Sequence, residues 1–420
     1  MTSLAYAALW FFVFSLPWEN FIVIPGVGVI SRVIGMVAIG LTVVATIISG
    51  RFRRWHPFHI AALLFVVWAG LILLVVYSPT VMPKKFWTFV QLLFMVWMIW
   101  ELAQSRSRQL GLLTAYVLGA YVSILDTIML YRRSAGALRR FAGGGGDPND
   151  LAMTLAAALP MAWYLGMTHH RPIVRWICRA YLPLGLLAIG LTGSRGGMLA
   201  SIVALLIVPL TMTKLSPGKL ALAILLLTGS GALALAYVPQ TIVNRLATTG
   251  SEVEDLSLGG RLRIWKAGVN AFVQRPLIGY GTGAFKIAVS RYLGYAPQVA
   301  HNSFLSVLVE EGLVGFLLYA AMFIAVFLSL MKLPSLERRF TLVLLATIMA
   351  AMLPLSWDDR KTVWFVLAAL IGMAQIRYTA AGAFRQRWPG EGAPVFRSPM
   401  AGRPREPLSV PLRNTRWNAP

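Results

Sequence analysis

The sequence predicts an all-α integral membrane protein with about twelve transmembrane helices. Of its 420 residues, 58% are hydrophobic and only 13% are charged, which is too apolar for an ordinary soluble protein of this size. Apolar stretches long enough to cross a hydrocarbon core of about 30 Å recur along almost the whole chain. No cleavable signal peptide with a basic start is evident, so we expect the first apolar stretch to remain as an anchor.

The candidate spans are apolar runs separated by charged or Pro/Gly-rich breaks. Several contain Pro or Gly, which is common in membrane bundles. They lie near residues 4–16, 27–48, 59–77, 86–100, 110–131, 150–167, 177–192, 197–213, 219–238, 303–330, 340–356 and 362–378. A long segment, residues 239–302, separates the ninth span from the tenth and is the largest loop that the pattern predicts.

The positive charges in the connections predict the orientation of the bundle. With a cytoplasmic N-terminus, every second connection falls inside, and each of these is basic: 51–54, 106–108, 169–175, 214–219, 332–339 and the tail after Arg377. Basic cytoplasmic loops are what the positive-inside rule requires, and the opposite orientation would place all of them outside. We therefore expect a multi-pass protein of a bacterial inner membrane with both termini in the cytoplasm.

The same orientation places the loop 239–302, the loop 132–150 and the turn 192–197 in the periplasm. These outer segments break the charge rule because they carry ten arginines, namely Arg132, Arg133, Arg139, Arg140, Arg195, Arg245, Arg261, Arg263, Arg275 and Arg291. Arginines on this side suggest an anionic substrate, since the guanidinium group presents a fork of donors to phosphate oxygens.

Composition also excludes several classes of function. The net charge of +23 fits basic loops that meet anionic lipid, and we expect no nucleic-acid partner. The single cysteine, Cys178, excludes an internal disulfide and a cysteine-based metal cluster. We find no P-loop lysine motif, His/Cys metal cluster or dinucleotide fingerprint, so we expect neither a metal nor a cofactor. An activated donor carried on a lipid fits an outer site better than a cytoplasmic nucleotide.

The first candidate site is the break Thr192-Gly193-Ser194-Arg195-Gly196-Gly197 between two apolar spans. Its glycines would let the backbone approach a ligand, and the next helix presents free N–H groups and a positive dipole end outward. Arg195 would bind phosphate oxygens, with Ser194 in support. The alternative is an interfacial arginine that snorkels beside a tight turn.

The second candidate site lies in the outer loop. Between Gly260 and Pro276, apolar residues recur at helical spacing while Arg263 and Lys266 fall on the other side, which predicts an amphipathic helix with Arg261 at its start. That helix either lies on the membrane surface or packs on the bundle. The glycine-rich turn 279–283 follows and is a weak candidate for binding an anion.

The third candidate site is His301, where the outer loop re-enters the membrane. Asn302 or Ser303 would cap the new helix, and the helix dipole favours the neutral imidazole, which can take a proton from a hydroxyl. Glu310 lies two turns into this helix and needs a partner or a polar cavity. The alternative is a boundary histidine without a chemical role.

Two more carboxylates, Asp147 and Asp150, precede the sixth span. They would support the chemistry at the outer face, or they would form a turn that caps the helix. The sequence pattern leaves both interpretations open.

These motifs resemble those of the O-antigen ligase superfamily. His301-Asn302, then nine residues, then Gly312-Leu313-Val314-Gly315 is similar to its H-N-x9-G-x-x-G signature. The turn 192–196 is similar to its outer-face arginine turn, and the segment from Arg261 to Phe285 is similar to its large-loop pattern. The resemblance extends over residues 192–316 and elsewhere rests on topology alone.

The resemblance implies an inverting, metal-independent glycosyltransferase with a GT-C-like helical bundle in residues 1–378. It implies a donor glycan on undecaprenyl diphosphate, with Arg195 and Arg261 on the diphosphate and His301 as general base. Arg263 and Arg275 are further candidates for the diphosphate, and Asn302 for a supporting role. The acceptor would be lipid A–core for a ligase, or a lipid-linked repeat for a polymerase of O-antigen or exopolysaccharide.

Two rival functions are a flippase for lipid-linked oligosaccharides and a transporter of another anionic solute. A flippase would need charges along a path through the whole bundle, whereas these charges gather on one face. The segment 379–420 is rich in Arg, Pro and Gly, and we expect a disordered cytoplasmic tail near the inner leaflet.

Overall fold

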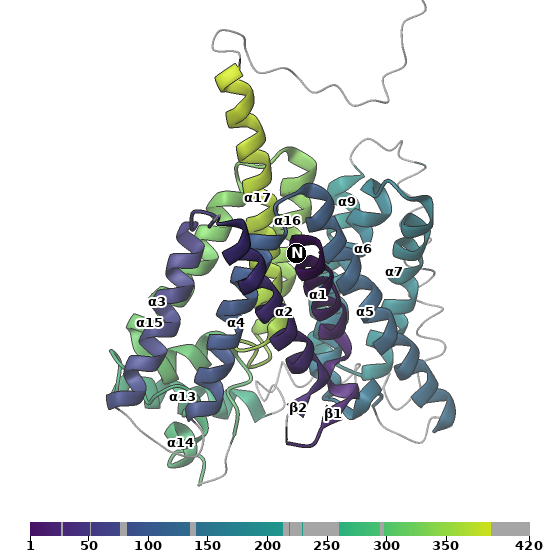
Figure 1. Cartoon of the computed structure of the whole chain (residues 1–420). Helices are drawn as coiled ribbons and strands as arrows, with labels where there is room; N and C mark the ends of the chain where they lie inside the picture. The colour runs from purple at the N-terminus through teal and green to yellow at the C-terminus, as the bar shows by residue number, and fades with distance from the viewer. Residues whose placement is uncertain are drawn as a thin grey trace, which may run out of the picture. The chain divides into compact units, whose positions relative to one another are not determined.

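The protein is described by a computed structural model (Figure 1) that covers residues 1–26, 28–50, 52–75, 82–134, 140–212, 260–294 and 298–387, with 218 and 229 as isolated residues. The chain divides into two units, Met1–Arg377 and Tyr378–Pro420. All that follows concerns the first unit. Its described residues are all-α, as the sequence predicts, apart from a two-stranded antiparallel hairpin of β1 (Val23–Ile24) and β2 (Gly28–Val29).

The described helices follow the predicted apolar runs. Their bounds are α1 Thr2–Ser15, α2 Ile30–Ser49, α3 Pro57–Val75, α4 Met82–Leu102, α5 Arg106–Arg133, α6 Pro148–Thr168, α7 Pro172–Thr192, α8 Arg195–Leu205, α9 Ile207–Thr211, α13 Arg261–Gln274, α14 Phe285–Ser290, α15 Ser303–Leu330, α16 Ser335–Met352 and α17 Lys361–Arg387, with short 3-10 turns η1 Leu16–Phe21 and η2 Gly143–Gly145.

Seven described helices are long and apolar enough to cross a membrane, namely α2 to α7 and α15. The predicted spans 4–16, 197–213, 340–356 and 362–378 also coincide with helices, but these are shorter or more polar. The predicted span 219–238, apart from residue 229, and the loop residues 239–259 lie outside the described residues. The count of about twelve spans and the full extent of the large loop therefore stay predictions.

Two predicted boundaries need correction. The span predicted at 197–213 is interrupted at Leu206, which separates α8 from α9. Pro209 explains the break, because proline lacks the N–H that a continuous helix would pair with the carbonyl of Leu205. At the other boundary, α17 continues to Arg387, past the predicted limit at 378, because the first proline of the tail is Pro389.

The basic connections gather at one end of the first unit, which we call the basic end. The backbone N–H of Arg53, before α3, donates to Oε1 of Glu101 at the end of α4 (3.0 Å). At the start of α5, Arg106 lies 3.4 Å from Glu337 of α16. These contacts bring together three connections that the sequence predicts to be cytoplasmic.

The opposite end, which we call the site end, is organised by the connection 353–360 between α16 and α17. The backbone N–H of Trp357 donates to Oγ of Ser303, the first residue of α15 (2.7 Å). The indole N–H of the same tryptophan donates to Oδ1 of Asp150 in the first turn of α6 (2.9 Å). One buried tryptophan therefore fixes the starts of two helices that are far apart in the sequence.

A second, smaller apolar core lies at the site end. It joins α13, α14 and the first turns of α15, and its buried members are Ile264, Ala267, Ala271, Phe285, Ala288, Val289, Leu293, Ala300 and Val309. Gly268 of α13 brings the two helices close, since a Cβ atom there would lie 2.9 Å from Cδ2 of Leu305. Of the two interpretations of the amphipathic helix, the structure supports packing on the bundle.

Candidate functional site

Arg195 is the first residue of α8 and follows a tight turn. Gly193 ends α7 in the left-handed conformation, with φ of 58°, which glycine adopts at little cost. Ser194 caps α8, because its buried Oγ accepts from the backbone N–H of Gly197 (3.2 Å). This arrangement fixes Arg195 at the helix N-terminus, where the backbone dipole favours a bound anion.

The glycines after Arg195 serve helix packing. A Cβ atom on Gly197 would lie 2.3 Å from Cβ of Ala152 in α6, and one on Gly196 would lie 2.8 Å from Cγ of Pro354. The sequence analysis assigned these glycines to the approach of a ligand. In the structure they let α8 approach α6 and the connection 353–360.

A polar network that the sequence analysis missed holds this turn. Oδ1 of Asn149 accepts from Ser194 Oγ (3.0 Å) and from the guanidinium of Arg140 (2.7 Å). Arg140 also donates from Nε to the carbonyl of Thr192 (2.9 Å). Arg140 therefore crosslinks the loop before α6 to the turn that carries Arg195. The sequence offered one signal for this role of Arg140, namely that it is one of the arginines predicted to lie on the outer side.

Arg261 and His301 are brought together by α13. The indole N–H of Trp265 donates to the carbonyl of Ala300 (3.1 Å), which holds the chain next to His301. Arg261 lies one turn earlier on the same face of α13. The positive charge of Arg261 lowers the pKa of His301, so the two side chains lie close enough to interact electrostatically.

His301 has an unusual backbone. Its φ of 46° makes it the only non-glycine residue with positive φ among those that the structure describes. Such a conformation is costly for a residue with a side chain and clusters at functional sites. The next residue, Asn302, caps α15, since its Oδ1 accepts from the backbone N–H of Leu305 (2.9 Å). Asn302 therefore starts the helix that follows the histidine.

The charges around His301 have opposite effects on its pKa. Burial and then the charge of Arg261 lower its pKa from the ordinary value of 6.5, whereas Asp147 and Asp150 act in the opposite direction. The net shift is downward, so the imidazole is neutral near pH 7 and able to accept a proton. Asp147 also caps α6, as one of the two interpretations of that turn predicts, because its Oδ1 accepts from the N–H of Asn149 (2.6 Å).

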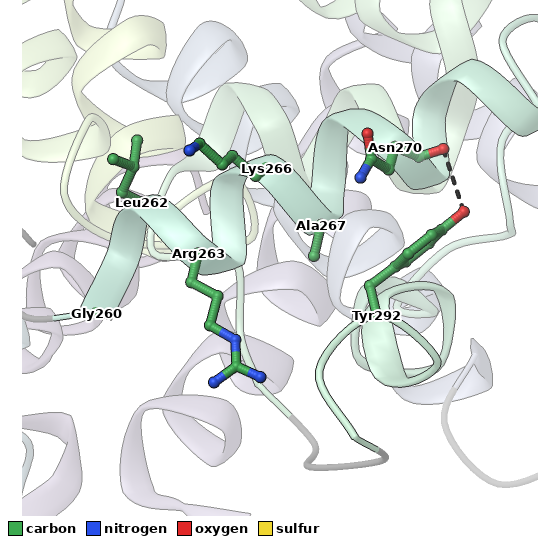
Figure 2. A pocket seen from close by; sticks show the side chains of 7 residues that line it. All are labelled: Gly260, Leu262, Arg263, Lys266, Ala267, Asn270 and Tyr292. Carbon is green, nitrogen blue, oxygen red and sulfur yellow. Dashed lines mark hydrogen bonds between the residues drawn. The ribbon is translucent and has the colours of Figure 1, made fainter.

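The structure separates two predicted arginines from this group. Arg263 lines an open pocket together with Leu262, Lys266 and Tyr292, and in Figure 2 its side chain points away from those of Leu262 and Lys266. Arg263 is two residues after Arg261, so its side chain is rotated by about 200° around the helix axis from that of Arg261. Arg275 ends α13 and stacks on Tyr280, with Cζ 5.0 Å from the ring centroid. Fourteen residues of helix separate it from Arg261 by about 20 Å, too far to share one diphosphate.

Glu310 has a structural environment. Its carboxylate accepts from the backbone N–H groups of Gly283 (2.8 Å) and Phe285 (3.3 Å) and from Ser306 Oγ (3.3 Å). Lys85 Nζ lies 2.6 Å from the same carboxylate. The glycine-rich turn 279–283 does bind an anion, and that anion is the side chain of Glu310.

The same turn explains the glycine signature in α15. Gly312 has φ of 67° and interrupts the helix, so that Tyr280 and Gly281 donate their backbone N–H groups to the carbonyls of Val309 (3.0 Å) and Glu310 (2.8 Å). A Cβ atom on Gly312 would lie 2.2 Å from the carbonyl oxygen of Leu277. The glycine is required by close backbone contact.

Residues 180–320 match the family model described as O-antigen ligase. This segment is similar to the O-antigen ligase superfamily. A search of curated proteins finds no match. The matched segment contains Arg195, Arg261 and His301.

Several residues around the O-antigen ligase segment complete the site and were missed in the sequence. Asp358, in the connection 353–360, is fully buried and lies 2.5 Å from Lys85 Nζ. Arg360 donates to Oδ2 of Asp150 (2.6 Å). Lys85 and Asp358 are charged residues beside apolar runs, a pattern that marks functional or structural centres in membrane proteins.

Proposed function

We propose that this chain transfers a glycan from undecaprenyl diphosphate to an acceptor hydroxyl at the outer face of the bacterial inner membrane. One observation carries the proposal. His301 has a positive φ and a lowered pKa, and it lies within the electrostatic influence of Arg261, Asp147 and Asp150. This arrangement suits a neutral base close to both a cation and carboxylates.

The proposed reaction is a single displacement. His301 takes the proton of the acceptor hydroxyl while its oxygen bonds to the anomeric carbon. The bond from that carbon to the diphosphate breaks, and the electron pair leaves with the lipid diphosphate. Arg195 and Arg261, each at a helix N-terminus, offset the charge that develops on the leaving group. One displacement inverts the anomeric configuration and requires no metal.

The acceptor would be lipid A–core for a ligase, or a lipid-linked repeat for a polymerase of O-antigen or exopolysaccharide. The donor-side residues are the same in both cases. The orientation that supports this chemistry has the site end in the periplasm and the basic end in the cytoplasm, as the positive-inside rule favours.

The test is the glycan profile of a deletion strain complemented with the wild type, His301→Ala or Arg195→Ala. We expect His301→Ala to reduce transfer by about 10²–10⁴-fold and Arg195→Ala to abolish it, with normal amounts of protein in the membrane. Bare lipid A–core with long polymer left on the carrier identifies a ligase, and single repeats identify a polymerase. Full complementation by both variants would refute the proposed chemistry.

A further inference from the structure

The site end contains a polar pocket that the proposed chemistry has not used. It is built by η1, the start of α6 and the start of α17, and its lining includes Trp18, Glu19, Asp150, Trp357 and Lys361. Aromatic rings beside carboxylates and cations offer both an apolar surface and directional hydrogen bonds. Such a lining suits a molecule rich in hydroxyl groups.

The charged side chains of this pocket suit sugar hydroxyls. Three carboxylates, of Glu19, Asp147 and Asp150, line it together with two cations, Arg360 and Lys361. Both cations are already paired, Arg360 with Asp150 and Lys361 with Glu19. Sugar hydroxyls can donate to these carboxylates.

The pocket lies within electrostatic reach of His301. Asp147 and Asp150 line the pocket and also act electrostatically on the histidine. Arg261 acts on the histidine too but is absent from the lining. A sugar in the pocket and a diphosphate beside Arg261 would therefore occupy different places near the same base, as an acceptor and a donor must.

An apolar groove adjoins this pocket. It lies between α1, α2 and α4, which pack against one another (Figure 1), and Met36, Ile39, Met95 and Met98 are among its lining residues. From Thr88 to Met98 it follows one face of α4 for about 15 Å. Methionine side chains adapt to flexible apolar ligands, so the groove suits a hydrocarbon chain.

Lys361 connects the groove to the pocket, because it lines both. Its Nζ bonds to Oγ of Ser31 (3.0 Å), which lines the groove, and pairs with Glu19, which lines the pocket. Arg32 lines the polar end of the groove as well. Cations at the junction of an apolar groove and a sugar pocket match the phosphate that links a saccharide to its lipid.

We propose that the groove and the pocket together bind the acceptor as a lipid-linked saccharide. The hydrocarbon chain lies between α1, α2 and α4, the linking phosphate lies at Lys361 and Arg32, and the terminal sugar presents its hydroxyl to His301. This inference rests on the proposed function. All the residues named for it except His301 lie outside the segment 180–320 that matches the O-antigen ligase family, so acceptor selection is assigned to the rest of the chain.

The experiment compares Met36→Trp with Val37→Trp in the purified full-length protein. The two residues are neighbours on α2 with similar exposure, 53% and 55%, but only Met36 lines the groove. The rate of glycan transfer is measured in three series. They vary the concentration of the lipid-linked acceptor, of the same saccharide released from its lipid, and of the donor. We expect Met36→Trp to raise KM for the lipid-linked acceptor by about tenfold, the binding energy of roughly two methylene groups.

The same change should leave the KM values for the released saccharide and for the donor unchanged, and Val37→Trp should alter none of the three. Equal kinetics for the two variants would overturn the inference while leaving the proposed function standing. A rise in the donor KM alone would assign the groove to the donor lipid and also overturn it. If the wild type transfers no glycan at all, the proposed function itself fails.

Discussion

At the scale of single residues, His301 combines strain, charge and position. Its backbone is held in a conformation that a side chain disfavours, and the helix cap at Asn302 and the bond from Trp265 to Ala300 keep it there. The neighbouring charges act in opposite directions on its pKa. These opposing charges give a test of the general-base role that does not remove the histidine.

We predict that Asp147→Asn moves the acid limb of the pH–rate profile to lower pH. Asp147 raises the pKa of His301, so removing its charge lowers that pKa further and keeps the base neutral in more acidic solution. Asparagine remains a good helix cap, which should preserve α6. The measurement is kcat/KM for transfer as a function of pH.

The matched control is Asp126→Asn. Asp126 accepts from the N–H of Gly144 (2.8 Å) and is not among the charges that act on His301. Its removal should leave the acid limb in place. An unchanged profile for Asp147→Asn would mean that another group controls the rate.

At the scale of elements, the kink of α15 and the glycine-rich turn form one unit. The carbonyls released at the kink accept from the turn, while the carboxylate of Glu310 occupies the N–H groups of Gly283 and Phe285. Lys85 compensates the buried charge from α4. The unit supports α13, which carries Arg261, and therefore connects the glycine signature to the geometry of the site.

We predict that Gly312→Ala destabilises the protein much more than Gly294→Ala. The two glycines have similar φ angles, 67° and 66°, so both changes place a side chain at positive φ, which is strained. Only at Gly312 would the new Cβ meet backbone, 2.2 Å from Leu277 O, since Gly294 has nothing within 4 Å. The thermal unfolding midpoint in detergent should separate them, and equal midpoints would contradict the role given to the kink.

At the scale of the whole first unit, the two ends differ in kind. The basic end gathers arginines of the connections, joined by the contacts of Arg53 and Arg106. At the site end the starts of α6, α8, α15 and α17 meet around the connection 353–360. The apolar helices between them predict a membrane-spanning protein whose chemistry is confined to one side.

We predict that a phosphatase reporter fused after Pro297 is active, because it should lie in the periplasm. The same reporter fused after Lys332, at the basic end, should be inactive, because the basic connections should stay in the cytoplasm. Alkaline phosphatase activity of intact cells, normalised to the amount of fusion protein, gives the measurement. The reverse pattern would invert the orientation and place the proposed site in the cytoplasm.

The sequence by itself determined the helices and their local signals. Long apolar runs specify membrane helices because the hydrocarbon core leaves backbone groups no other partners. The caps Asp147 and Asn302 and the start of α13 at Arg261 follow from short-range patterns. The length of α13 was enough to separate Arg275 from Arg261, so the sequence contained the evidence against that pairing.

Tertiary structure alone decided which distant residues meet. Lys85 pairs with Glu310 across 225 positions of the chain, and Asp150 bonds to Trp357 across 207. Periodicity and capping rules act over a few residues and carry no information about such pairs. The connection 353–360, the Lys361 junction and the division of charge around His301 depend on how helices pack side by side, because buried charges are stable only where packing brings a partner to them.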